Sequence, residues 1–225
     1  MNNTYQTLII EDHPFIMEGY TRVLEHISKS QGNYSFNIST AKNCDEAILE
    51  IEHALNHNIL DLVFLDISLP ASNDRKFLSG DDLGIKIRAS FPMVKIIIAT
   101  HLENNYRLVN ILKTIQPNGL LLKNELTFKN LTDGVLNILN DIPFYSSPIL
   151  KLVRQHISND FNLDNIDRQI LYHLSLGTKT KELPNLVHLS ISGIENRKRR
   201  LNLIFNNEKK NDKNLLKLAK EYGFL

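Results

Sequence analysis

The stretch LVFLDISLP, residues 62–70, decides the predicted fold. Its first four residues are apolar without alternation, which is typical of a strand buried on both faces of a parallel sheet. Asp66 follows this run directly. Because ligands bind at the carboxyl ends of the strands in open parallel sheets, the sequence predicts that Asp66 lies at a functional site.

Further apolar runs of this chain end in the same way. The polar residues that follow them are Glu11 and Asp12, then Thr100, and then Lys123. Because parallel strands end at a common edge of their sheet, these side chains and Asp66 are predicted to converge there. The expected site combines carboxylates with one hydroxyl and one ammonium group.

Short apolar runs alternate with amphipathic stretches, which predicts a doubly wound α/β fold with a five-stranded parallel sheet. After Pro143 this pattern breaks, and an apolar-periodic stretch predicts a linker helix over residues 149–157. From Leu163 onward the pattern is all helical. The predicted strands are 6–10, 35–39, 61–65, 95–99 and 119–122; the predicted helices are 14–29, 44–56, 81–90, 104–115, 128–140, 165–176, 181–187, 191–206 and 213–222.

A chain of 225 residues is long enough for two small domains. We expect an α/β domain over residues 1–141, a linker over residues 142–162 and a small all-α domain over residues 163–225. That last segment holds 12 Lys and Arg against 7 Asp and Glu, a balance that suits a polyanionic partner. With one cysteine, no signal-peptide pattern and no membrane-spanning run, a cytoplasmic protein that does not bind membranes is expected.

Four strings, LIIEDHP, VFLDISLP, IIIATH and GLLLKN, resemble the receiver domain of bacterial two-component response regulators. The resemblance covers roughly residues 5–140 and implies a flavodoxin-like or CheY-like fold. It implies a Mg²⁺ site formed by Asp12, Asp66 and the backbone carbonyl of Ser68, with Glu11 acting through a bound water.

The same resemblance implies that Asp66 accepts a phosphoryl group from a sensor histidine kinase. Lys123 would pair with Asp66 and then with the phosphoryl oxygens, and Thr100 would donate a hydrogen bond to one of them. The expected protein is a regulator and not an enzyme, with only its own phosphorylation and dephosphorylation as chemistry. A haloacid-dehalogenase-type phosphatase is disfavoured, because that class needs a second Asp where this chain has Ser68.

Three features depart from the receiver pattern. The segment Ala71 to Ser79 is longer than usual, and Gly80 best matches the glycine before the next helix. His101 follows Thr100, where a small residue is usual; it either gates Asp66 or is a partly exposed histidine at a helix start. Leu120 replaces the aromatic residue of the family's switch, which leaves open a regulator that works without phosphorylation.

The C-terminal segment begins with a predicted capping box, in which Asp164 caps the helix and Asp167 reaches back. The string KTKELPNLVHLSISGIENRKRRLNLIF, residues 179–205, then resembles the helix-turn-helix of LuxR-type output domains. In that pattern residues 181–187 are the scaffold helix, Ser190 is the N-cap and residues 191–206 are the recognition helix. Pro184 is expected to distort the first scaffold turn. The whole chain resembles NarL/FixJ-type response regulators.

Helical spacing assigns roles within the recognition helix. Ile194, Leu201 and Phe205 share one face and are predicted to be core. Another face carries side chains suited to base edges, since Asn suits adenine, Arg guanine and Glu cytosine. The predicted base-reading residues are Glu195, Asn196 and Arg199; the predicted phosphate contacts are Lys179, Arg197, Lys198 and Arg200.

Two alternatives to DNA reading stay open. The basic run could be a solvated helix face in which Glu195 pairs with Arg199. The helical tail could instead bind a protein and not DNA. The preferred interpretation remains a DNA-binding transcription regulator, with double-stranded DNA, a sensor histidine kinase and a second copy of itself, when phosphorylated, as partners.

Overall fold

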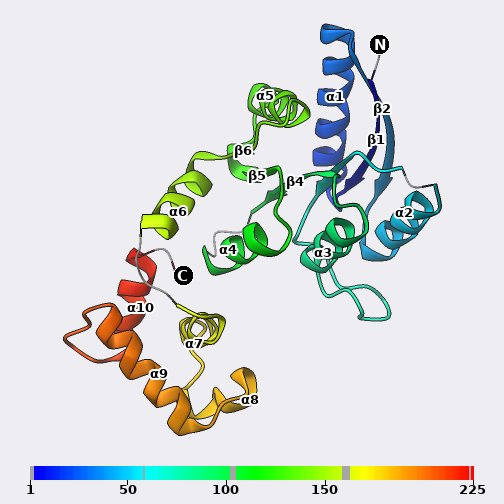
Figure 1. The fold of residues 1–225 in the computed structure, drawn as a ribbon. Helices are drawn as coiled ribbons and strands as arrows, with labels where there is room; N and C mark the ends of the chain where they lie inside the picture. Colours follow the sequence, from blue (N-terminus) through cyan, green and yellow to red (C-terminus); the bar gives the residue numbers. More distant parts are fainter. Residues whose placement is uncertain (1–2, 58, 102–104, 159–162, 223) are drawn as a thin grey trace. The chain divides into compact units, whose positions relative to one another are not determined.

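The computed structural model describes residues 3–57, 59–101, 105–158, 163–222 and 224–225, which form two compact units (Figure 1). The first unit comprises residues 1–102 and 111–149. The second comprises residues 150–225 and 103–110. Among the described residues, no helix combines the length and apolar character needed to cross a membrane.

The first unit is built on a six-stranded sheet with the strand order β2-β1-β3-β4-β5-β6. Every neighbouring pair of strands is parallel. All four residues of β3 are buried, as the apolar run at residues 62–65 predicted. The strands are β1 (Asn3–Ile10), β2 (Tyr34–Ala41), β3 (Leu62–Leu65), β4 (Lys95–Thr100), β5 (Gly119–Leu122) and β6 (Phe144–Tyr145).

The sixth strand corrects the prediction of five strands. β6 pairs with the otherwise open edge of β5, where the backbone N–H of Phe144 donates to the carbonyl of Asn118 at 2.9 Å. Gly134 leaves room for the Phe144 ring, since a Cβ added at Gly134 would lie 2.7 Å from that ring. A two-residue strand between prolines shows no alternation, so the sequence pattern did not reveal it.

Helices cover both faces of this sheet, as predicted for a doubly wound fold. Phe64 of β3 stacks on Tyr20 of α1 with ring centroids 4.9 Å apart, and its neighbour Leu65 points toward Gly84 of α3 on the other face. α1 also packs against α5, and α2 packs against α3. The helices are α1 (Pro14–Gln31), α2 (Cys44–His57), α3 (Gly80–Ser90), α4 (Asn105–Thr114) and α5 (Phe128–Leu139).

The remaining helices include the predicted linker helix, α6 (Ser147–Ser158). The sequence predicts a loop over residues 158–162, but Ser158 ends α6, and residues 159–162 lie outside the described part of the chain. Four further helices follow: α7 (Asn165–Ser175), α8 (Pro184–Val187), α9 (Ile191–Ile204) and α10 (Asp212–Glu221). Ile194, Leu201 and Phe205 are buried in their shared core, which confirms the predicted core face of the recognition helix.

The scaffold helix differs from the prediction of one helix over residues 181–187. A 3-10 turn, η2 (Thr180–Glu182), precedes α8, which begins only at Pro184. Proline has no backbone N–H and is tolerated at the start of a helix, so the break falls where Pro184 predicted distortion. The recognition helix also ends earlier than predicted, at Ile204, because Asn206 adopts a left-handed conformation with φ 50°.

Candidate functional site

The sheet register brings Glu11 and Asp66 together. Ile10 pairs with Leu65 at the ends of β1 and β3, and the N–H of Asp66 donates to the carbonyl of Ile10 at 2.9 Å. Leu65 also pairs with Ile98 of β4, two residues before Thr100. The polar residues that follow these apolar runs therefore gather at the carboxyl edge of the sheet, as predicted.

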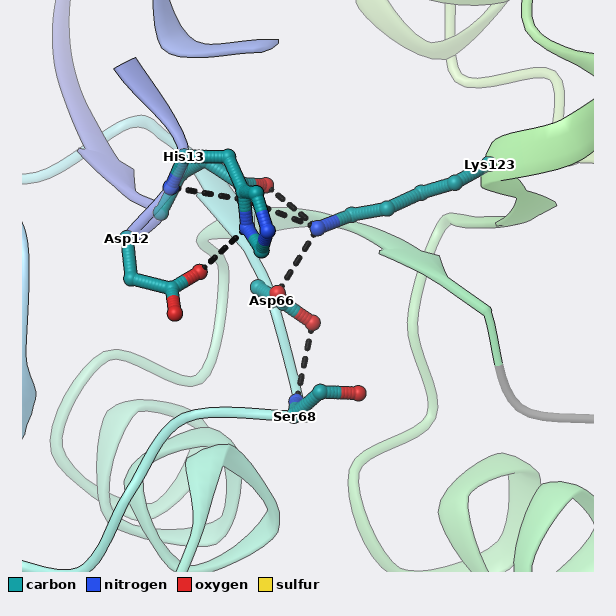
Figure 2. A network of polar contacts seen from close by, with 6 residues as sticks. Asp12, His13, Asp66, Ser68 and Lys123 are labelled. Atoms are coloured by element: carbon teal, nitrogen blue, oxygen red, sulfur yellow. Dashed lines mark hydrogen bonds and ion pairs between the residues drawn. The ribbon is translucent and has the colours of Figure 1, made fainter.

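Lys123 supplies the cationic centre of this site (Figure 2). It follows β5 at the start of a short 3-10 turn, η1 (Lys123–Glu125). Its Nζ donates to Asp66 Oδ2 at 2.7 Å and to Glu11 Oε1 at 2.8 Å. Because all three side chains are nearly inaccessible to solvent, this ammonium reduces the repulsion between the two carboxylates, although its single positive charge offsets only one of their two negative charges.

Asp66 is held on both of its carboxylate oxygens. While Oδ2 accepts from Lys123, Oδ1 accepts from the backbone N–H of Ser68 at 2.8 Å (Figure 2). The residue is 2% exposed. The carboxylate is thus fixed in orientation at the edge where the strands end.

Glu11 lies deepest, with no exposed surface. Burial raises the pKa of its carboxyl group, while the hydrogen bond from Lys123 opposes that rise. Its Oε2 lies 2.8 Å from the same ammonium but accepts no hydrogen bond within the described part of the chain. A buried carboxylate oxygen with an unfilled coordination position suits a nearby cation or a cation-bound water.

Asp12 and His13 form the open side of the site (Figure 2). His13 Nδ1 lies 2.7 Å from Asp12 Oδ1 and 3.3 Å from Glu11 Oε1. The hydrogen bond to Asp12 raises the pKa of the His13 imidazole. Sequence analysis did not single out His13 as a site residue, although it directly follows the Glu11-Asp12 pair.

Potential ligand atoms of Glu11, Asp12, His13 and Asp66 all lie within 4.8 Å of one another. The donors are mainly carboxylate oxygens, which Mg²⁺ prefers. Together with the unfilled Glu11 oxygen, this donor set fits a divalent cation.

Thr100, the last residue of β4, is fully buried, and it pairs in register with Leu122 directly before Lys123. His101 is exposed. Leu120 is buried in β5. These positions do not decide whether His101 gates Asp66, or whether Leu120 weakens the switch.

The long segment between β3 and α3 is folded back on itself. The N–H of Ser72 donates to the carbonyl of Phe77 at 2.8 Å, and the N–H of Phe77 donates to Ser72 Oγ at 3.1 Å. α3 begins at Gly80, one residue earlier than the predicted helix over residues 81–90, and the match of Gly80 to the family's glycine stays a prediction. A Cβ at Gly80 would lie 2.1 Å from the carbonyl oxygen of Asp66, so the start of α3 sits directly against the backbone of that residue.

In the second unit, the predicted base-reading residues of α9 are all exposed. Ser190 caps this helix by accepting from the N–H of Gly193 at 3.2 Å. Arg199 donates to Asn196 Oδ1 at 2.5 Å, and not to Glu195 as the alternative of a solvated salt-bridged face required. The exposed surface thus presents an amide and a guanidinium side by side.

Arg197 and Lys198, two of the predicted phosphate contacts, form hydrogen bonds with other residues of the same unit. Arg197 bonds Asp164 Oδ2 at 2.6 Å and Asp167 Oδ1 at 2.8 Å. Asp164 caps α7 as predicted, but Asp167 uses its carboxylate for this arginine instead of reaching back to complete a capping box. Arg200 lies 3.7 Å from Asp167 Oδ2 and is half exposed.

Lys198 is the most enclosed of the four basic residues, at 9% exposure. Its Nζ donates to Thr180 Oγ1 at 2.8 Å and to Asp212 Oδ2 at 3.0 Å, and so ties α9 to η2 and α10. Lys179 is exposed. Their phosphate contacts stay predictions, and the geometry favours Lys179 and Arg200 over Arg197 and Lys198.

Comparison with known proteins supports the fold. No protein-family model matches the sequence, and no curated protein matches it. RcsB of Salmonella enterica serovar Typhimurium, solved bound to promoter P1flhDC in the presence of phosphomimetic BeF3-, matches with a TM-score of 0.63 at 20% identity, over 96% of this chain and 98% of that one. The chain has the fold of a response regulator.

Two further structures agree. A LuxR-family two-component response regulator from Aurantimonas sp. SI85-9A1 matches with a TM-score of 0.53 at 19% identity, over 69% of this chain and 100% of that one. The isolated REC domain of RcsB matches with a TM-score of 0.52 at 19% identity, over 66% of this chain and 98% of that one. These two matches cover about two thirds of the chain, whereas the match to DNA-bound RcsB covers both units, which confirms the predicted α/β fold followed by a helical unit.

Proposed function

We propose that this protein is a two-component response regulator in which phosphorylation of Asp66 controls DNA binding and dimerisation. The observation that carries the proposal is the Asp66 carboxylate, held between the Lys123 ammonium and the Ser68 N–H. In the proposed organisation residues 1–141 are the receiver, residues 142–162 the linker and residues 163–225 the DNA-binding domain.

The proposed reaction is transfer of a phosphoryl group to Asp66 from a phosphohistidine of a sensor kinase. A carboxylate oxygen of Asp66 forms a bond to phosphorus while the bond to the histidine nitrogen breaks, leaving the imidazole on the kinase. Lys123 is already within hydrogen-bonding distance of Asp66 and can neutralise the added charge on the phosphoryl oxygens. Thr100 ends the neighbouring strand and is proposed to donate to one of these oxygens.

The carboxylate cluster is proposed to hold Mg²⁺ through Asp12, Asp66 and the Ser68 carbonyl, with Glu11 acting through a bound water. A bound Mg²⁺ would neutralise charge on the reacting phosphoryl oxygens. The Asp12 side chain is 36% exposed, so an ion from solvent can reach its carboxylate without a change in the surrounding structure. Glu11 Oε2 accepts no hydrogen bond within the described part of the chain, although the Lys123 Nζ lies 2.8 Å from it, and it is the Glu11 atom proposed to contact a metal-bound water.

Phosphorylation can be tested with a small acyl-phosphate donor and Mg²⁺. One alkali-labile phosphoryl group per chain is expected, and Asp66→Asn should abolish it. Asp74→Asn is the matched control, since Asp74 is an exposed carboxylate in the segment that follows β3. Labelling of Asp66→Asn to the wild-type extent would show that another residue accepts the group.

The second unit is proposed to bind double-stranded DNA with Glu195, Asn196 and Arg199 at base edges. Arg199→Ala should weaken binding by about 1–3 kcal/mol and relax preference at one base pair. Affinities on selected duplexes and on mixed-sequence DNA test this. An equal loss on every duplex would make Arg199 a phosphate contact only.

A protein-binding tail is the second candidate, and a specific observation favours it. Arg197 and Lys198 are neutralised inside the unit, so the basic run offers less free charge to phosphates than its sequence indicates. DNA binding predicts retention on duplex DNA that falls steeply with salt. The absence of such retention would favour the protein-binding tail.

A further inference from the structure

Ion pairs within the second unit cancel the charge of some of its basic residues and leave that of others free. Asp164 and Asp167 pair with Arg197, and Asp212 pairs with Lys198, so two of the four basic residues of α9 are neutralised. Lys209 and Lys210 are exposed in the turn between α9 and α10. The described residues offer the Lys210 side chain no acceptor, which leaves its charge available to a partner.

This turn is held rigidly by a buried asparagine. Asn207 is 3% exposed, and its Nδ2 donates to Asn202 Oδ1 at 2.5 Å and to the carbonyl of Asn211 at 3.1 Å. Its Oδ1 accepts from Asn214 Nδ2 at 2.6 Å. Asn207 therefore joins the end of α9, the turn and α10 through one side chain.

Lys210 adopts a backbone conformation that lysine rarely takes. Its φ is 49°, in the left-handed region, and its N–H donates to the carbonyl of Asn207 at 3.1 Å. Left-handed conformations of residues other than glycine, asparagine and aspartate persist where the surrounding structure enforces them, and they concentrate at functional sites. In this turn the hydrogen bonds of Asn207 join residues on both sides of Lys210.

The turn also lies beside the proposed reading face. A groove of about 750 Å³ has Glu195 and Arg199 of α9 and Lys210 of the turn among its lining residues. Lys198 and Asp212, which pair with each other, line it as well, and so does Glu208. The lining of one groove thus includes both Lys210 and Arg199, the residue assigned to base reading.

We propose that Lys210 contacts a DNA phosphate beside the bases read by α9, and that Asn207 is the positioning residue that presents it. This inference rests on the proposed DNA binding. The partner is the sugar-phosphate backbone of a duplex, because a single ammonium beside a base-reading helix suits a phosphate that flanks the contacted base pairs. Nothing in the basic run at residues 197–200 indicated this residue, since Lys210 lies after the recognition helix.

The test measures affinity of the full chain, treated with Mg²⁺ and a small phosphodonor, for a mixed-sequence duplex and a selected duplex between about 50 and 200 mM salt. Lys210→Gln should lower the slope of log affinity against log salt by about 0.9, which is about eightfold in affinity at 0.1 M salt. The loss should be equal on both duplexes, and Lys210→Arg should restore binding.

Three further variants separate a phosphate contact by Lys210 from an effect of net charge and from an effect on stability. Lys220→Gln removes the same charge from an exposed residue of α10 that does not line the groove, and it should leave the slope unchanged. Lys210→Gly favours the positive φ, so it should bind as weakly as Lys210→Gln while its thermal midpoint is not lowered. Asn207→Ala should weaken binding on both duplexes without changing the preference between them.

An unchanged slope in Lys210→Gln, with wild type binding normally, would overturn this inference alone. Equal slope reductions in Lys210→Gln and Lys220→Gln would also overturn it, since they would indicate only net charge. If wild type shows no salt-dependent binding to either duplex, the proposed DNA binding fails and this inference fails with it.

Discussion

The ammonium of Lys123 lies 2.7 Å from Oδ2 of Asp66, and both side chains are almost entirely buried. The same ammonium contacts Glu11, so one positive charge lies between two buried carboxylates. Removing one partner of a buried ion pair is costly, because the remaining charge stays desolvated without a partner. Lys123 therefore stabilises both carboxylates, although their combined negative charge exceeds its single positive charge.

Lys123→Met should lower the free energy of unfolding by about 3–5 kcal/mol, because it leaves two buried carboxylates without a cation. Lys76→Met is the control, since Lys76 forms an exposed pair with Asp74 and should change stability by about 0–1 kcal/mol. Urea unfolding followed by circular dichroism measures both. A Lys123→Met variant as stable as the control would mean that the carboxylates are not both ionised in the folded protein.

Gly80→Ala should displace the backbone at Asp66 and slow its phosphorylation. The added Cβ would lie 2.1 Å from the Asp66 carbonyl oxygen and 2.6 Å from Ile67 Cα, and both of these are backbone atoms that cannot rotate away. Gly19→Ala in α1 is the matched control, because its Cβ meets nothing within 4 Å and alanine favours a helix by up to about 1 kcal/mol. Phosphorylation rates and thermal midpoints test the pair.

A Gly80→Ala variant that is phosphorylated at the wild-type rate would show that α3 can retreat without moving Asp66. The two glycine substitutions are expected to differ in their effects on stability and on phosphorylation rate. Gly80→Ala loses both stability and rate, while Gly19→Ala keeps its rate and gains or retains stability.

The receiver unit was largely predictable because its signals are local. Each apolar run of a buried parallel strand is continuous in sequence, and the polar residue that follows it must lie at the strand's carboxyl end. Asp66 and Lys123 therefore meet although they are 57 residues apart. β6 was missed because two extended residues carry no periodicity, and their strand exists only through pairing with β5.

The helical unit was less predictable at its charged positions. Lys198 is buried because Asp212 and Thr180 approach it from other elements, and helical spacing alone does not reveal such partners. Asp167 was expected to complete a capping box, but Arg197 lies close enough to take its carboxylate. Core positions such as Ile194 were predictable, since apolar periodicity already specifies the buried face.

The pairing of Asp164 with Arg197 should make the stability of the helical unit depend on pH in acid. Partial burial raises the pKa of Asp164, but the hydrogen bonds from Arg197 and from the N–H of Asp167 outweigh it and hold the pKa below its usual range. A lowered folded pKa contributes stability above the unfolded value of about 3.9, and this is lost as pH falls through the folded pKa.

Asp164→Asn keeps an N-cap acceptor and removes the charge, so it isolates that contribution. At pH 7 the variant should be less stable than wild type by under about 1 kcal/mol, because the Asp164 side chain is 47% exposed. The difference should disappear as pH falls below 4 and through the folded pKa. Chemical unfolding at stepped pH measures it, and a difference that is constant at every pH would contradict the pairing.

Lys198 separates a structural role from a DNA-contacting one. Because its Nζ bonds Thr180 and Asp212 while the side chain is mostly buried, Lys198→Met should lower the free energy of unfolding by about 1–3 kcal/mol. The salt dependence of DNA binding should stay unchanged, since this ammonium is already paired with Asp212. Its neighbour Arg199 is exposed, so Arg199→Ala should change stability by less than about 0.5 kcal/mol and alter base preference instead.

Unfolding curves and DNA titrations at several salt concentrations, run on both variants, decide between the roles. If Lys198→Met retains wild-type stability and lowers the salt slope by about one, Lys198 reaches a phosphate, as the sequence predicted, and the contacts with Thr180 and Asp212 give way on binding.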